Sequence, residues 1–234
     1  MSWNSVYKLV SSYIVSIATP EGRGTGFLFA YNTDRSIMAF ATAAHVVDHA
    51  HDWKQPLRLI HHDSEKEMFV EARDRVILLY RQRDSASILV GNAAFSLPPT
   101  TLPLMPPDKV RRIGDQVAWA GFPSIAYPNL CFFAGRVSAY LDDDKSYLID
   151  GVAINGVSGG PVFAQRSGAP QIIGTVSAYM PNRVRGETLP GLLRAQDLTA
   201  FHRTIEKLRS LDEAREQEAE ESKQAQKKAG EAGA

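Results

Sequence analysis

The chain has 234 residues and a formal net charge of zero; 44% of its residues are hydrophobic and 22% are charged. This composition is typical of a globular protein and excludes a disordered, collagen-like or coiled-coil chain over the whole length. Zero net charge also argues against the basic surface that nucleic-acid binding usually requires. The single cysteine, Cys131, excludes an internal disulfide and a cysteine-rich zinc module, so we expect a reducing compartment, the cytoplasm.

Short apolar segments separated by turns rich in glycine and proline follow one another along most of the chain. This spacing predicts an all-β barrel or sandwich. The expected strands cover residues 10–17, 26–31, 37–42, 57–61, 76–80, 87–90, 116–120, 135–140, 147–149, 161–164 and 172–177. Apolar residues three and four apart are clear only from Leu198 to Leu208, and they predict an amphipathic helix over about residues 195–211.

No segment approaches the roughly 18 to 20 consecutive apolar residues of a membrane-spanning helix, so we expect no membrane insertion. The segment closest to a signal peptide, residues 9–18, is interrupted by serines. The apolar core of a signal peptide is normally a cleaner run, and we therefore assign this segment to the folded body.

The last 23 residues, 212–234, differ in composition from the rest. They contain no Leu, Ile, Val, Met or aromatic residue, and they carry seven acidic against four basic side chains. We interpret residues 1–211 as one folded domain and residues 212–234 as a polar tail. The tail is either a solvated extension of the last helix or disordered. Its role is either inert or that of a docking element for a partner protein.

The most informative segment runs from Asn155 to Val162 and reads NGVSGGPV. Glycine is needed where the backbone turns with a positive φ or approaches a ligand closely, so the segment predicts a loop that presents Ser158. The amides of Gly156 and Ser158 would then form an oxyanion hole. The alternative is a tight turn between strands with an incidental serine.

The same segment also fits the Gly-x-Ser-x-Gly turn of α/β-hydrolases. That fold requires an acid and a histidine after the serine, and the only histidine after Ser158 is His202, on the expected terminal helix. The order of the residues therefore disfavours an α/β-hydrolase.

A serine nucleophile needs a base, and the base needs a third group that orients it. His45 closes the motif Thr-Ala-Ala-His at the end of an expected strand, and Asp84 opens another in DSASIL; Asp74 is the alternative acid. His45 and His49 are four residues apart and are the alternative as metal ligands. Val46 stands where the corresponding zinc motif needs glutamate, so we do not expect a metal site. Serine, histidine and aspartate chemistry needs no organic cofactor either, so we expect none.

These motifs, in the order His45, Asp84 and Ser158, resemble those of the trypsin-like serine peptidases, and most closely those of the bacterial HtrA-type branch. Further similar segments are GTGFLF, residues 135–139 and residues 174–177, and the resemblance covers about residues 6–208. It implies two six-stranded β-barrels with a C-terminal helix, and a bacterial serine endopeptidase that cleaves protein or peptide substrates. The residues after Leu208 are too few for the PDZ domain common in that branch.

The resemblance also implies a substrate pocket. Val152 and Ala153 precede the serine loop, Ser177 ends the expected strand over residues 172–177, and Ala178 and Tyr179 follow Ser177. No acid that would select Lys or Arg is present among them, so we expect a small or medium apolar P1 residue. Tyr179 would narrow the pocket.

Val157 stands where the family usually carries Asn or Asp. In the digestive and clotting branch, that aspartate pairs with an N-terminus released by cleavage, so we expect no such maturation here. Together with Tyr179 and the polar tail, Val157 motivates an alternative function: a peptidase-fold binding or regulatory module that is inactive, or is activated only by a partner.

Overall fold

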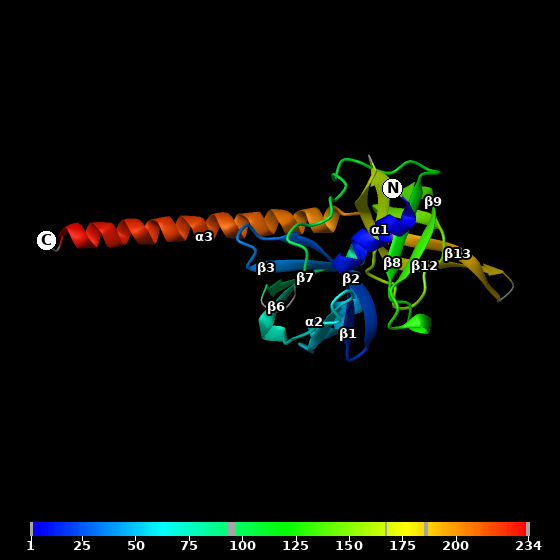
Figure 1. Cartoon of the computed structure of the whole chain (residues 1–234), viewed down its shortest axis with the longest axis horizontal. Helices are drawn as coiled ribbons and strands as arrows, with labels where there is room; N and C mark the ends of the chain where they lie inside the picture. The colour runs from blue at the N-terminus through cyan, green and yellow to red at the C-terminus, as the bar shows by residue number, and fades with distance from the viewer. Residues whose placement is uncertain (1, 93–96, 167, 185–186, 233–234) are drawn as a thin grey trace.

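Two antiparallel β-sheets form the body of the protein in a computed structural model that describes residues 2–92, 97–166, 168–184 and 187–232 (Figure 1). The first sheet has seven strands in the order β5-β4-β1-β2-β3-β7-β6. Its strands are β1 Ile14–Thr19, β2 Gly22–Tyr31, β3 Ile37–Thr42, β4 Leu57–His61, β5 Glu67–Val70, β6 Arg75–Tyr80 and β7 Ser85–Gly91. Below, this sheet is called the first sheet.

The second sheet closes into a six-stranded barrel in the order β10-β13-β12-β11-β8-β9, called the second barrel below. Its strands are β8 Gln116–Gly121, β9 Cys131–Leu141, β10 Ser146–Asp150, β11 Pro161–Arg166, β12 Ala169–Val184 and β13 Glu187–Gln196. The predicted all-β double-barrel class with a C-terminal helix is confirmed. The first sheet has seven strands instead of the expected six.

The described residues also form the α-helices α1 Trp3–Val10, α2 Ala44–Asp52 and α3 Thr199–Ala232. The 3₁₀ turns are η1 Ser11–Tyr13, η2 Ala72–Asp74, η3 Arg81–Arg83 and η4 Ser124–Ala126. The helices in the described part of the chain lack a stretch that is both long and apolar enough to cross a membrane.

The N-terminal segment corrects one of the strand predictions. The strand expected over residues 10–17 begins only at Ile14, because Val10 ends α1 and η1 follows. Val6 and Val10 are buried on one face of α1, and the Trp3 ring lies 5.8 Å from the Phe132 ring of the second barrel. Eight residues are too few for a helical period to stand out in the sequence, which is why α1 was missed.

Two strands were also missed, and the last helix was placed too early. The β5 sequence EMFV is half exposed, and the β13 sequence ETLPGLLRAQ contains Pro and Gly, which are rare inside strands. The helix predicted from residue 195 starts at Thr199, because Ala195 and Gln196 pair with β10. Strand pairing between distant segments decided this boundary, and local helical spacing did not.

The first part of α3 packs on the first sheet. The Phe201 ring is fully buried and lies 5.1 Å from the Phe29 ring of β2, and the hydroxyls of Thr204 and Ser87 are 2.8 Å apart. Figure 1 shows the rest of α3 projecting away from the body. Residues 213–224 are exposed, and α3 crosses the predicted boundary at residue 211 without a break. A docking role for this projection stays a prediction.

Asp212, the first residue assigned to the polar tail, is buried. Its Oδ2 accepts a hydrogen bond of 2.7 Å from the Thr33 amide, and its Oδ1 accepts one of 3.1 Å from Asn32 Nδ2. The polar composition of residues 212–234 hid this contact, because a carboxylate was not expected to anchor a helix to the turn between β2 and β3.

We therefore predict that Asp212→Ala lowers the free energy of unfolding by about 1.5 to 3 kcal/mol, since hydrogen bonds to a charged group contribute about this much. Urea unfolding followed by circular dichroism measures the change. Glu213→Ala, at the exposed neighbouring position, is the control and should change the free energy little. Equal stability of the two variants would contradict the anchoring role.

Candidate active site

His45 and Asp84 lie at the same end of two neighbouring strands. β3 and β7 are antiparallel, and Thr42 at the end of β3 pairs with Ala86 near the start of β7. His45 follows β3 as the second residue of α2, and Asp84 immediately precedes β7. Strand pairing therefore brings the two side chains together across 39 positions of sequence.

Asp84 has an unusual backbone conformation, with φ 40° and ψ 46°, between η3 and β7. Aspartate enters this left-handed region more readily than bulkier residues. Backbone strain of this kind is concentrated at functional sites, which is consistent with a functional role for Asp84.

The Asp84 carboxylate accepts hydrogen bonds from α2, which follows the first-sheet strand β3, and from β12 of the second barrel. His45 Nδ1 lies 3.0 Å from Asp84 Oδ1 and 2.9 Å from Oδ2, and the His45 amide donates to Oδ1 over 3.0 Å. Ser177 of β12 donates its hydroxyl to Oδ2 over 2.6 Å. Because a carboxylate only accepts, the His45 ring carries a proton on Nδ1, and in the neutral ring Nε2 keeps a free lone pair.

This contact shifts both pKa values. The hydrogen bond to Asp84 raises the pKa of His45 above its ordinary value of 6.5, and burial opposes the rise. Burial raises the pKa of Asp84, but hydrogen bonds from His45 and Ser177 outweigh it, so the net pKa lies below the ordinary value. Asp84 is thus ionised, and it stabilises a positive charge on the imidazole.

In the loop that carries Ser158, several backbone carbonyl groups accept hydrogen bonds from backbone amides. The Val157 amide donates to Ile154 O over 3.0 Å, which closes a turn with Gly156 at φ +93°. Ser124 N donates to Asn155 O over 2.7 Å, and Gly160 N donates to Val157 O over 2.9 Å.

The hydrogen-bonded carbonyls of Asn155 and Val157 fix the direction of the amides in the same peptide groups, those of Gly156 and Ser158. In a trans peptide the N–H points opposite to the C=O, so the Gly156 and Ser158 amides point away from the groups that hold Asn155 O and Val157 O. Within the described part of the chain, neither amide donates a hydrogen bond to a protein group. Both are therefore available to a ligand.

A cavity of about 240 Å³ joins the two halves of the site. It is lined by His45 from α2, by Gly156 and Ser158 from the loop, and by residues of the hairpin between β1 and β2 that include Arg23. Among the described residues, no hydrogen bond joins Ser158 to His45. Catalytic hydrogen bonds are often long or poorly aligned before substrate binds, so the absence of this bond is compatible with Ser158 and His45 reacting together.

A trypsin-like peptidase domain is the family whose pattern matches this chain, over residues 24–171. The chain belongs to the trypsin-like peptidase family. The match covers more than half of its length and includes His45, Asp84 and Ser158. No curated protein sequence matches the chain.

Solved structures of peptidases share the fold. A serine endoprotease from Yersinia pestis has a TM-score of 0.65 and 18% identity, over 89% of this chain and 66% of that chain. Deg5 has a TM-score of 0.63 and 17% identity, over 86% and 90% of the two chains. An inactive serine-to-alanine mutant of Rv3671c from M. tuberculosis H37Rv has a TM-score of 0.58 and 19% identity, over 88% and 90%. These likenesses show a trypsin-like, HtrA-type fold.

The alternatives for the acid and for a metal site have other contacts. Asp74, in η2, pairs with Arg73 at 3.9 Å and is exposed. His49 Nδ1 lies 3.1 Å from Gln55 Oε1. Among the described residues, no group of three His, Cys, Asp or Glu side chains is arranged to hold a metal ion.

The predicted pocket residues of this trypsin-like chain have different surroundings. Val152 and Ala178 are exposed, and Ala153 packs partly against the core. Ser177 is buried and directs its hydroxyl to Asp84, a role that sequence reasoning missed. The side chain of Tyr179 lies outside the described residues. The assignment of these five residues to a substrate pocket stays a prediction.

Val157, the departure from the family pattern, is fully buried in the core. A Cβ at Gly121 would lie 2.9 Å from the Val157 side chain, so the close approach of β8 to the loop needs glycine there. An apolar contact thus occupies the position where the family pattern described above usually has Asn or Asp.

Sequence reasoning also missed Thr25 of β2. Its hydroxyl donates to Gly156 O over 2.7 Å, and its amide donates to Ser158 O over 2.8 Å. The only local signal was a polar residue between two glycines in GTGFLF, which we interpreted as part of a strand and turn.

We predict that the pKa of His45, measured by NMR titration, lies above 6.5 and falls below that value in Asp84→Asn. The substitution removes the negative charge of Asp84, and the burial that lowers the pKa then outweighs the smaller effect of the Asp48 charge, which raises it. Asp74→Asn, at the exposed alternative acid, should leave the His45 titration unchanged. A His45 pKa unaffected by Asp84→Asn would contradict the contact.

Proposed function

We propose that this trypsin-like protein is a serine endopeptidase. Ser158 attacks the peptide carbonyl, His45 acts as general base and then general acid, Asp84 orients His45, and the Gly156 and Ser158 amides bind the oxyanion. The observation that carries the proposal is the His45–Asp84 contact beside a cavity that Ser158 also lines.

The protonation states support the base role. With a proton on Nδ1 directed at Asp84, the neutral His45 ring offers Nε2 to the Ser158 hydroxyl. When Ser158 attacks, its proton passes to Nε2, and the imidazolium that forms is stabilised by the carboxylate. The same proton then goes to the leaving amine as the peptide bond breaks. Water repeats the sequence on the acyl-enzyme and regenerates Ser158.

The loop geometry supports the oxyanion role. The negative charge that develops on the carbonyl oxygen needs donors that are already oriented, because reorientation during the reaction costs free energy. The orientation of the Gly156 and Ser158 amides is fixed because the carbonyl group of each peptide, Asn155 O and Val157 O, already accepts a hydrogen bond. No metal ion is required for this chemistry.

The alternative is a peptidase-fold binding or regulatory module that is inactive until a partner acts on it. The absent hydrogen bond between Ser158 and His45, among the described residues, is the observation in its favour. The two proposals differ in one property, the reactivity of Ser158 in the protein alone.

A fluorophosphonate probe distinguishes them. We predict that the folded wild-type protein is labelled on Ser158 at neutral pH, that Ser158→Ala is not labelled, and that His45→Ala is labelled at least about 10²-fold more slowly, since the base contributes this much or more. Heat-denatured protein controls for non-specific reaction. An unlabelled wild type that circular dichroism shows to be folded would contradict the endopeptidase proposal and favour the regulatory module.

We also propose protein or peptide substrates with an apolar P1 residue, because the segment before the loop supplies Val152 and Ala153 and no acid. Cleavage of a proteome-derived peptide library, with Ser158→Ala as control, measures this preference. Small or medium apolar residues should be enriched at P1; enrichment of Lys or Arg would contradict the assignment.

A further inference from the structure

We propose that Thr25 is a positioning residue for the oxyanion site, holding Gly156 in the orientation that directs its amide into the cleft. The inference rests on the proposed endopeptidase function and deepens it. Thr25 lies on β2 of the first sheet, whereas Gly156 belongs to the loop before β11 of the second barrel, 131 residues away in sequence.

The Thr25 hydroxyl makes two hydrogen bonds that use its donor and its acceptor capacity. Oγ1 donates to Gly156 O over 2.7 Å and accepts from Phe122 N over 3.0 Å. Thr25 has no exposed surface, so water cannot replace either bond without a rearrangement. A buried hydroxyl with both bonds made is a specific bridge between these two backbone groups.

The Thr25 backbone fastens the other end of the same segment. Its amide donates to Ser158 O over 2.8 Å, and its carbonyl accepts from Thr42 Oγ1 over 2.8 Å. Gly156 and Ser158, which carry the two proposed oxyanion donors, are therefore both bonded to one residue of β2.

Of Gly156 and Ser158, Gly156 is the residue whose conformation needs hydrogen bonds from outside the loop to be fixed. Its φ of +93° is accessible because it has no Cβ, and a Cβ there would collide with Phe122 O. The same freedom lets the peptide groups on either side of glycine rotate. Bonds to Asn155 O and Gly156 O, from Ser124 and Thr25, remove that freedom.

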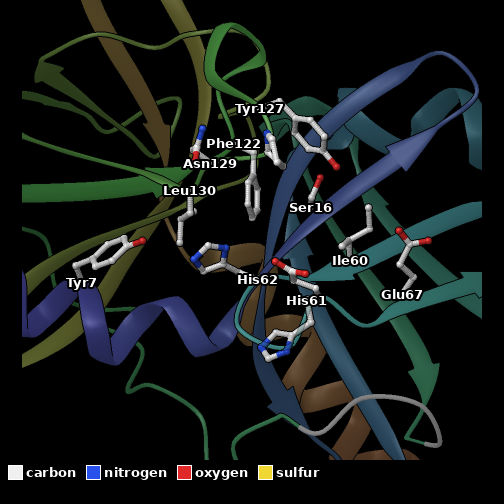
Figure 2. A pocket seen from close by; sticks show the side chains of 12 residues that line it. Tyr7, Ser16, Ile60, His61, His62, Glu67, Phe122, Tyr127, Asn129 and Leu130 are labelled. Carbon is white, nitrogen blue, oxygen red and sulfur yellow. The ribbon is translucent and has the colours of Figure 1, made fainter.

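Phe122, the partner of Thr25 in the loop after β8, is itself fixed by packing. Figure 2 shows its ring beside His62 in a separate cavity of about 510 Å³. The two rings are 5.9 Å apart in an edge-on arrangement, and the Tyr127 ring lies 6.5 Å from Phe122 on the other side. The Thr25 hydroxyl therefore accepts its hydrogen bond from the amide of a packed residue, Phe122, and this fixes the hydroxyl that donates to Gly156 O.

Replacing Thr25 by valine keeps the shape and removes the hydroxyl. Gly156 O and Phe122 N would then be buried without partners, and the turn would rotate to recover hydrogen bonds. Such a rotation of the Gly156–Val157 peptide displaces Gly156, and with it the amide on the other side of this residue, and it affects the oxyanion more than the bound peptide. The expected signature is a lower kcat with little change in KM.

The experiment compares Thr25→Val, Thr25→Ser and Thr204→Val with wild type on one apolar-P1 peptide. Thr204→Val is the matched control, because Thr204 is equally buried and hydrogen-bonded but lies on α3. We expect Thr25→Val to lower kcat by about 10- to 100-fold, less than or equal to the loss of a whole oxyanion donor. Thr25→Ser and Thr204→Val should stay within about threefold of wild type, with KM similar in all.

A second readout reports on the oxyanion directly. A peptide aldehyde forms a hemiacetal with Ser158, so its inhibition constant in Thr25→Val should rise by about the same factor by which kcat falls. If Thr25→Val does not fold, Thr25→Cys, with a weak donor of similar size, carries the same test with a smaller loss of kcat.

Wild-type kcat and aldehyde affinity in folded Thr25→Val would overturn the positioning role while leaving the endopeptidase proposal intact. An equal loss of kcat in Thr204→Val would overturn it as well, because general destabilisation would then explain the effect. Failure of the endopeptidase proposal looks different, since the wild type would neither cleave the peptide nor react with the fluorophosphonate probe.

Discussion

Hydrogen bonds from both halves of the molecule meet on one carboxylate, that of Asp84. His45, on α2 beside the first sheet, donates to it from its ring and its amide, and Ser177 donates to it from the second barrel. A shift of one sheet against the other would remove hydrogen-bond donors from the Asp84 carboxylate, which is largely shielded from water, and would therefore raise the free energy of the folded protein. The pKa of Asp84, the tautomer of His45 and the direction of the His45 ring all depend on this docking.

Thr25 makes a second connection between the two halves of the molecule. It fastens the loop of Ser158 to the first sheet through a side-chain and a backbone bond. The two connections are polar contacts between largely apolar cores, and polar bonds have narrower geometric limits than apolar packing. We infer that hydrophobic burial makes the sheets associate and that these bonds select the one arrangement that forms the site.

Those residues of the candidate site that stand in local patterns could be predicted from the sequence, and their catalytic roles stay a proposal. His45 and Ser158 stand in short motifs, and the order of the motifs led to the fold. Asp84 was favoured over Asp74 by pattern alone, and the pairing of β3 with β7 supplies the physical reason. Thr25 and the Ser177 hydroxyl were missed, because their partners lie 131 and 93 residues away and no local spacing encodes such contacts. The strand β13 was missed for a related reason, since its pairing with β10 and β12 outweighs the Pro and Gly within it.

We infer that the Ser158 loop presents two amides to the oxyanion formed beside His45, and a crystal structure of the phosphonylated protein tests this arrangement. We expect phosphorus bonded to Ser158 Oγ and the phosphonyl oxygen accepting hydrogen bonds of about 2.7 to 3.1 Å from the Gly156 and Ser158 amides. A phosphonyl oxygen directed to solvent, with the Gly156 amide turned away from it, would show that these amides do not form an oxyanion site.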